Sequence, residues 1–245
     1  TEQFQLMLEY FGQSPIIVRS SSLLEDAFGS AFAGKYESFF CVNQGSPEKR
    51  YEKFEEAVRR IFASTMSEDA LAYRLQRGLD QMDEQMALLV QRVSGAYHQS
   101  FFYPELAGVG LSYNPFVWKK GMDPHAGMIR LVFGLGTRAV NRVENDYPII
   151  VAADDPLVRP LAGMHDIRKF SQHYIDLLNL EQNDIQSLSV QELLEKQRPE
   201  KFDLLGTRDE EAAREMRRMG RPQKDIWILT FDSFLTRTSF IDWMK

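Results

Sequence analysis

An arginine followed by three serines is the first group of residues that could bind a ligand. Residues 15–26 read P-I-I-V-R-S-S-S-L-L-E-D, with Arg19 directly after the apolar run. A guanidinium group is always charged, and its flat fork suits polyphosphate oxygens, which backbone N–H groups of a small-residue loop can also approach. These residue types outline a nucleotide site anchored by Arg19. A salt bridge from Arg19 to Glu25 or Asp26 fits the sequence equally well.

The elements that would position Arg19 can be read from the flanking residues. The β-branched run at residues 16–18 predicts a short buried strand, covered on both sides. Residues 22–35 contain two glycines among small residues and predict a long loop. The aromatic run at residues 36–42 predicts a second strand. We therefore expect a strand, a long loop and a strand.

Further helices and strands follow along the chain. Ser46 and Pro47 predict the start of a helix, with serine as N-cap and proline at the first helical position. Apolar residues then recur at three- and four-residue steps, which places them on one helix face. We expect a second helix over residues 68–78 and strands within residues 86–93, 108–113 and 128–133.

The last third of the chain changes character. Residues 189–192 (S-V-Q-E) and 207–210 (T-R-D-E) both match a capping box, which predicts two helix starts. These helices should end near Pro199 and Gly220. Residues 226–231 predict a final strand. The expected fold is α/β (α+β), with a core over residues 1–154 in two subdomains and a helix-rich segment over residues 155–245 that continues the same domain.

Composition narrows the class of protein. The 245 residues are 44% hydrophobic, which is enough for a substantial core, and the net charge of -6 argues against nucleic acid or anionic lipid as a partner. No stretch approaches the roughly 20 apolar residues needed to cross a bilayer, and we expect a cytoplasmic protein without a membrane partner. The single cysteine, Cys41, predicts a buried, unreactive thiol. Both ends look cut from a longer chain.

The loop motif closely resembles a known family. Residues 18–26 and 32–38 match the pattern V-R-S-S-x-x-x-E-D followed by F-A-G-x-x-x-[TS] in the N-terminal nucleotide-binding domain of phosphoenolpyruvate synthase, pyruvate phosphate dikinase and rifampicin phosphotransferase. The resemblance implies that Arg19 contacts ATP phosphates. It also implies that Gly34 and Ser38 belong to a loop folded over the nucleotide. Relatives usually carry threonine where this chain has Ser38, and serine keeps the hydroxyl donor.

The resemblance extends to a segment that would hold the base. Residues 86–93, M-A-L-L-V-Q-R-V, look like the family's strand leading into the adenine hinge. In a hinge, a donor and an acceptor meet the edge of the base while apolar side chains cover the ring. Gln91 would be the hinge residue, and Leu89, Val90 and Val93 could cover the ring. The alternative is a buried strand with a glutamine at its edge.

Two later segments continue the resemblance in order. Residues 107–115, A-G-V-G-L-S-Y-N-P, look like the family's small-residue strand that ends in an Asn-Pro turn. Residues 128–136 look like the strand that ends in G-L-G-E, but Thr137 stands where relatives carry the glutamate. Position 137 of this chain therefore lacks the carboxylate that the resemblance implies for relatives. We expect Arg138 to make this site more basic.

The family implies an ATP-grasp-like fold and a phosphotransferase that uses ATP and Mg²⁺. Its intact members transfer a phosphoryl group from ATP to a carrier histidine on a separate phosphohistidine domain. The family's upstream lysine, downstream carboxylate strand and Q-x-R-P segment are not found in this chain, so we expect the Mg²⁺ ligands outside it and little activity of this chain alone. The alternative is a non-catalytic module that senses nucleotide or docks a partner within a larger regulatory protein.

No residue group predicts a metal site. The four histidines, at positions 98, 125, 165 and 173, are widely spaced. His125 does not resemble the family's phosphorylated-histidine motif and is expected in a turn or on the surface. Asp154 and Asp155 precede a proline and predict a turn.

Overall fold

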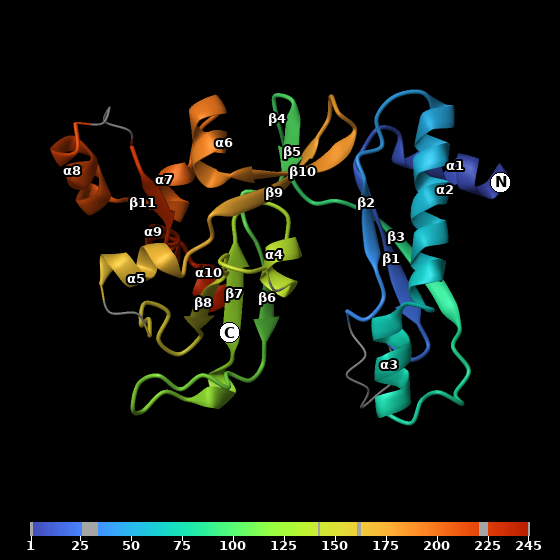
Figure 1. Ribbon diagram of the computed structural model, residues 1–245, viewed down its shortest axis with the longest axis horizontal. Coiled ribbons are helices and arrows are strands. Elements are labelled where there is room, and N and C mark those ends of the chain that lie inside the picture. Colours follow the sequence, from blue (N-terminus) through green and yellow to red (C-terminus); the bar gives the residue numbers. More distant parts are fainter. Residues whose placement is uncertain (1, 26–33, 142, 161–162, 221–224, 245) are drawn as a thin grey trace. The chain divides into compact units, whose positions relative to one another are not determined.

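The chain forms two compact units of mixed helix and strand, as expected for the α+β class (Figure 1). The structure is a computed structural model that describes residues 2–25, 34–141, 143–160, 163–220 and 225–244. The first unit comprises residues 1–94 and 178–185, and the second comprises residues 95–177 and 186–245. The expected domain boundary at residue 154 stays a prediction.

A three-stranded antiparallel sheet is the centre of the first unit. Its order is β2-β1-β3, with β1 at Ile16–Ser22, β2 at Ser38–Cys41 and β3 at Met86–Arg92. Helix α2 (Pro47–Ser64) runs along one face of this sheet (Figure 1), and its Phe54 and Ile61 pack with the strand residues. Helices α1 (Glu2–Phe11) and α3 (Glu68–Gln76) complete the unit.

Strand β1 is longer than the sequence predicted and is buried on one face. We expected a strand over residues 16–18 with both faces covered, but β1 continues to Ser22. Residues 20–22, expected next to or within the loop, pair with residues 86–88 of β3. The burial alternates along β1, since Ile16 and Val18 are inaccessible whereas Arg19 is exposed. On the second face of the sheet, Arg19, Ser38, Leu89 and Gln91 are exposed within the described part of the first unit.

The capping predictions are half right. Ser46 accepts a hydrogen bond from the Lys49 N–H at 3.4 Å and begins α2, and Ser189 forms the predicted capping box with Glu192. The second predicted box is wrong. Thr207 lies in β11 (Gly206–Arg208), where its hydroxyl bonds that of Thr230, and Asp209 is the N-cap of α8 (Glu210–Arg218).

Three further sheets and several short helices make up the rest of the chain. We expected one late strand, at β12 (Trp227–Leu229), but β9, β10 and β11 are also present after residue 154. The sheets have the orders β6-β7-β8, β10-β9-β5-β4 and β11-β12. The strands are β4 (Ala96–His98), β5 (Phe101–Tyr103), β6 (Ala107–Leu111), β7 (Met128–Val132), β8 (Ile149–Ala152), β9 (Tyr174–Asn179) and β10 (Asp184–Ser189). The helices are η1 (Pro124–Ala126), α4 (Thr137–Val140), α5 (Met164–Lys169), α6 (Val190–Lys196), α7 (Phe202–Leu205), α9 (Asp232–Arg237) and α10 (Phe240–Met244).

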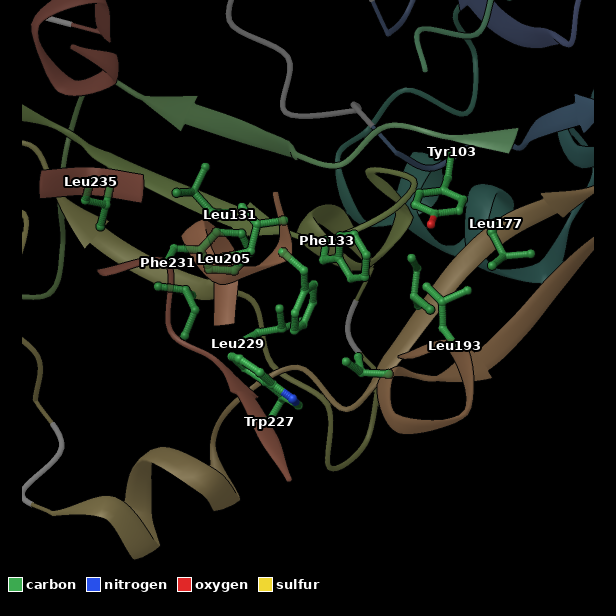
Figure 2. Packing of buried hydrophobic residues seen from close by; sticks show 14 of the residues in the cluster. Tyr103, Leu131, Phe133, Leu177, Leu193, Leu205, Trp227, Leu229, Phe231 and Leu235 are labelled. Carbon is green, nitrogen blue, oxygen red and sulfur yellow. The ribbon is translucent and has the colours of Figure 1, made fainter. Parts of the chain in front are cut away.

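The second unit has an aromatic core of its own (Figure 2). Phe133, Phe202 and Trp227 form successive edge-to-face contacts, with ring centroids 5.5 Å apart in both pairs. Such pairs contribute beyond the apolar area that they bury. Aliphatic side chains from β7, β9 and β12 surround these rings. The packing ties the sheets of this unit to α7.

The expectations about Cys41 and about membrane-spanning segments can be compared directly with the structure. Cys41 is buried, as predicted, and its burial raises the pKa of the thiol to about 11, so the group stays protonated and unreactive. Among the helices that the structure describes, none is both long enough and apolar enough to span a bilayer.

Candidate functional site

Arg19 stands at the centre of the uncovered face of the first sheet. Side chains alternate between the two faces of a strand, so Ile17 and Arg19 point away from the face that packs on α2. Directly opposite Arg19 lie Ser38 on β2 and Leu89 on β3. The structure thus places two residues of the sequence motif, Arg19 and Ser38, side by side on neighbouring strands.

Gln91 lies on the same face, one cross-strand pair further along. It is opposite Ile17 on β1, and Phe40 is opposite Ile17 on β2. We define the open face as Ile17, Arg19, Ser38, Phe40, Leu89 and Gln91. Leu89 is 44% exposed on this face, and the leucine beside it at position 88 packs into the core. The open face therefore combines one cation, two polar groups and an apolar floor.

The charge of Arg19 is not neutralised by a neighbouring acid within the described residues. No ion pair joins Arg19 to Glu25 or to any other carboxylate in that part of the chain, whereas exposed arginines on α2 do form such pairs. Asp26, the second partner considered from the sequence, lies outside the described residues. The salt-bridge alternative thus loses one of its two partners.

Strand β3 presents a free backbone edge beside Gln91. Its described neighbour is β1 alone, because it stands at the end of the order β2-β1-β3. The Val93 N–H donates to the Pro15 carbonyl at 2.9 Å, and the Leu23 N–H donates to the Gln85 carbonyl at 3.0 Å. Hydrogen-bonded and non-bonded pairs alternate in an antiparallel ladder, so the N–H and C=O of Val90 and Arg92 point outwards. A donor and an acceptor are available there for a planar ligand.

Gly34 and Val93 lie outside the strands that carry the other predicted site residues. Gly34 is exposed in the turn before β2 and has φ = 79°, a backbone conformation that glycine adopts without strain. Val93 follows the last residue of β3 and is half-buried. The structure therefore gathers Arg19, Ser38 and Gln91 on one face, with Val93 at its end and Gly34 four residues before Ser38.

Thr137 and Arg138 belong to a separate charged cluster in the second unit. The Thr137 hydroxyl donates to Asp176 at 2.7 Å. Arg138 pairs with Asp176 at 2.9 Å and also with Asp146, whose side chain is 2% exposed. The expectation that Arg138 makes this region more basic is wrong, because one guanidinium lies between two carboxylates. The cluster carries a net charge of about -1 from these three groups.

The sequence of this chain is similar to those of known proteins. Residues 1–223 match the model of the family described as "Pyruvate phosphate dikinase, AMP/ATP-binding domain". The chain belongs to this family. It is 28% identical over 197 residues to phosphoenolpyruvate synthase of Escherichia coli (strain K12). The matched region covers 73% of this chain and 22% of that protein. It is 24% identical over 218 residues to rifampicin phosphotransferase of Streptomyces sviceus, or 89% of this chain and 22% of that protein.

A third relative is an uncharacterized phosphotransferase of Bacillus subtilis (strain 168). It is 30% identical over 126 residues, which cover 51% of this chain and 13% of that protein. The chain thus spans less than a quarter of the length of each of these relatives.

No magnesium ligand can be assigned within the described part of this dikinase-family chain. Its histidines, cysteine and carboxylates form no group of three or more that could hold a metal ion. Asp154 accepts a hydrogen bond from the Asp123 N–H at 2.8 Å, and Asp155 pairs with Lys119 at 3.0 Å. Both aspartates thus bond the loop at residues 119–123, and the predicted turn is present, because the Val158 N–H donates to the Asp155 carbonyl at 3.2 Å.

Glu84 is a residue of this region that the sequence did not single out. It precedes β3 and accepts hydrogen bonds from the Leu24 N–H, at 3.3 Å, and from the Tyr36 hydroxyl. Burial and then the hydrogen bond to Glu84 raise the pKa of Tyr36, so the phenol remains a donor. Glutamate in a loop between a helix and a strand carries no sequence signal for such a contact.

Proposed function

We propose that the open face of the first unit binds ATP in the manner of its dikinase relatives. The observation that carries this proposal is an exposed arginine without an acidic partner in the described residues, paired with a hydroxyl on an otherwise apolar sheet face. Guanidinium and hydroxyl donors suit phosphate oxygens. The apolar floor of Ile17, Phe40 and Leu89 suits the faces of a base or a ribose.

The order of the strands suggests how the nucleotide lies. Adenine needs a donor and an acceptor at its edge, and the free edge of β3 beside Gln91 offers both. From there to β2 the distance is two strand spacings, or about 10 Å. A nucleotide lying across the strands would place its phosphates over Arg19 and then Ser38. Val93 would cover the base, and Gly34 would belong to the loop near the phosphates.

The chemistry proposed for the intact protein is phosphoryl transfer from ATP to a carrier histidine on a phosphohistidine domain. The fold that we propose for the complete nucleotide domain is ATP-grasp-like. Mg²⁺, held by residues outside this chain, would neutralise charge on the transferred group. Within this chain, Arg19 holds and orients the phosphates, and Ser38 donates a hydrogen bond to them. Loss of these contacts would reduce phosphate binding before any chemical step.

A second function has one specific observation in its favour. Thr137 replaces the glutamate that relatives carry and is hydrogen-bonded to Asp176, so this position contributes to an internal network. A chain that binds nucleotide without turnover, as a sensor or docking module, would not need that glutamate. The two functions differ in whether a longer protein with both flanking regions transfers phosphate from ATP to itself.

Calorimetric titration of the chain with ATP, with and without Mg²⁺, tests the site. Arg19→Ala should weaken ATP binding by about 10- to 100-fold, as expected for the loss of hydrogen bonds to a charged group. Adenosine binding should change less than about 2-fold, since the base lies away from Arg19. Arg59→Ala on α2 is the matched control, because Arg59 is an exposed arginine of the same unit, paired with Glu55.

The outcome that would reject the site is equally specific. If Arg19→Ala and Arg59→Ala bind ATP as the unaltered chain does, the open face is not the phosphate site. The same titration on a longer protein that includes both flanking regions should give tighter binding in the presence of Mg²⁺. Failure of that longer protein to bind ATP would reject nucleotide binding altogether.

A further inference from the structure

Glu84 joins two segments that are far apart in the sequence. One carboxylate oxygen accepts the Leu24 N–H and the other accepts the Tyr36 hydroxyl. Leu24 lies just after β1 and Tyr36 just before β2, so a single side chain holds the two flanks of the connection between these strands. We refer to Glu84, Leu24 and Tyr36 as the clamp.

The clamp lies on a small buried cluster. Leu24 is 1% exposed and Tyr36 is 5% exposed, and both pack with Ala70 of α3. The neighbouring residues are also fixed, because the Glu37 N–H donates to the Ser64 hydroxyl at 3.2 Å and the Lys35 ammonium lies 4.8 Å from the centre of the Tyr73 ring. Each flank is therefore attached to the body of the first unit.

The position of the clamp matters for the open face. Tyr36 is two residues before Ser38, which is opposite Arg19. A shift of β2 by one residue would turn the Ser38 hydroxyl to the covered face of the sheet. One side chain bonds both flanks, so Glu84 is well suited to fix this register.

We infer that Glu84 is a positioning residue that holds the Ser38 hydroxyl beside Arg19 and so prepares the pair for the phosphates of a nucleotide. This inference rests on the proposed function of the open face. Glu84 acts through the clamp, since its two oxygens accept the Leu24 N–H and the Tyr36 hydroxyl, and its negative charge makes it unsuited to contact phosphates. Its removal should weaken phosphate binding without affecting the base.

Four variants of the full chain test the clamp. Glu84→Ala removes both hydrogen bonds, and Tyr36→Phe removes one of them. Glu84→Gln keeps both, because its carbonyl accepts the Leu24 N–H and its amide donates to the phenol oxygen. Asp83→Ala is the matched control, since Asp83 is the adjacent acidic residue and is exposed.

The first measurement is trypsin cleavage after Lys35 in the absence of nucleotide. Glu84→Ala and Tyr36→Phe should speed this cleavage more than about 5-fold, relative to cleavage after Lys53 in α2, because the opened flank becomes accessible. Glu84→Gln and Asp83→Ala should cleave like the unaltered chain. Equal acceleration at Lys35 and Lys53 would indicate general loosening and would overturn the inference, as would no acceleration at Lys35.

The second measurement compares ATP with adenosine. Glu84→Ala should weaken ATP binding about 10-fold and adenosine binding less than 2-fold, with Glu84→Gln restoring ATP affinity. Unchanged ATP affinity in Glu84→Ala, beside normal binding by the unaltered chain, would overturn this inference alone. If neither the unaltered chain nor the longer protein binds ATP, the proposed function fails and the positioning role fails with it, whatever the cleavage result.

Discussion

At the scale of single residues, Thr137 shows how a changed residue is accommodated. Its hydroxyl donates to one oxygen of Asp176, and Arg138 pairs with the other oxygen and with Asp146. Arg138 also donates to the Ser187 hydroxyl at 2.6 Å. A residue with a donor hydroxyl thus completes a network that joins the start of α4 to β9 and β10. This explains why a threonine fits here.

Placing at position 137 the glutamate that the resemblance implies for relatives should therefore destabilise this chain. Thr137→Glu would place a second carboxylate beside Asp176 and remove the hydroxyl donor, which should lower the free energy of unfolding by about 1–3 kcal/mol. Thr137→Ser keeps the hydroxyl and should cost less than about 1 kcal/mol. Urea denaturation measures both values. A Thr137→Glu variant as stable as the unaltered chain would show that the network contributes nothing.

At the scale of elements, local signals succeeded where no distant partner competed. Ser46 and Pro47 predict the start of α2 because the cap is made by adjacent residues. Thr207 satisfied the same kind of pattern but pairs in β11 instead, and Asp209 two residues later takes the cap. The extension of β1 to Ser22 likewise depends on β3, about 70 residues away in sequence. A local sequence pattern does not show which distant strand a segment will pair with.

The candidate site was predictable to the same extent. The sequence motifs identified Arg19, Ser38 and Gln91. Because side chains alternate between the two faces of a strand, the strand pairing then places these three residues on one face. That this face is exposed in the described part of the first unit depends on α2 packing against the other face, which residue types alone do not give. Glu84 had no motif, because its role arises from two contacts across the fold.

Helix α8 offers a prediction about pH. Its cap, Asp209, is 1% exposed and bonds the Ala212 N–H as well as Arg168 of α5. Burial alone would raise the pKa of Asp209, but the hydrogen bonds from Arg168 and from the backbone more than compensate, and the pKa lies below its ordinary value. A lowered carboxyl pKa in the folded state stabilises the protein above the unfolded-state pKa, and this contribution is lost as the pH falls through the folded-state value.

Asp209→Asn should remove that contribution. We expect a loss of about 1–3 kcal/mol in the free energy of unfolding at pH 7, because hydrogen bonds to a charged group are lost. The difference from the unaltered chain should shrink as the pH falls below the unfolded-state pKa of about 4 and on through the lower folded-state pKa of Asp209. Asp203→Asn is the control, since Asp203 pairs with Arg198 but is 69% exposed. A difference for Asp209→Asn that does not vary with pH would contradict this account.

At the scale of the whole molecule, each unit has a separate hydrophobic core. The core of the first unit is formed by α2 and the covered face of its sheet, and the core of the second by aromatic and aliphatic side chains around Phe133. All three tryptophans, at positions 118, 227 and 243, are in the second unit. Tryptophan fluorescence therefore reports on one unit, whereas far-UV circular dichroism reports on the helices of both.

Two core truncations should show that the two units unfold independently. Phe54→Ala in the first unit and Phe133→Ala in the second both remove a phenyl ring that is at most 1% exposed, at a cost of about 3–5 kcal/mol each. Phe54→Ala should lower the denaturation midpoint seen by circular dichroism and leave the fluorescence midpoint unchanged. Phe133→Ala should lower the fluorescence midpoint. Equal shifts of the fluorescence midpoint by both variants would mean that the units unfold together, and that a nucleotide bound to the first unit would stabilise the second as well.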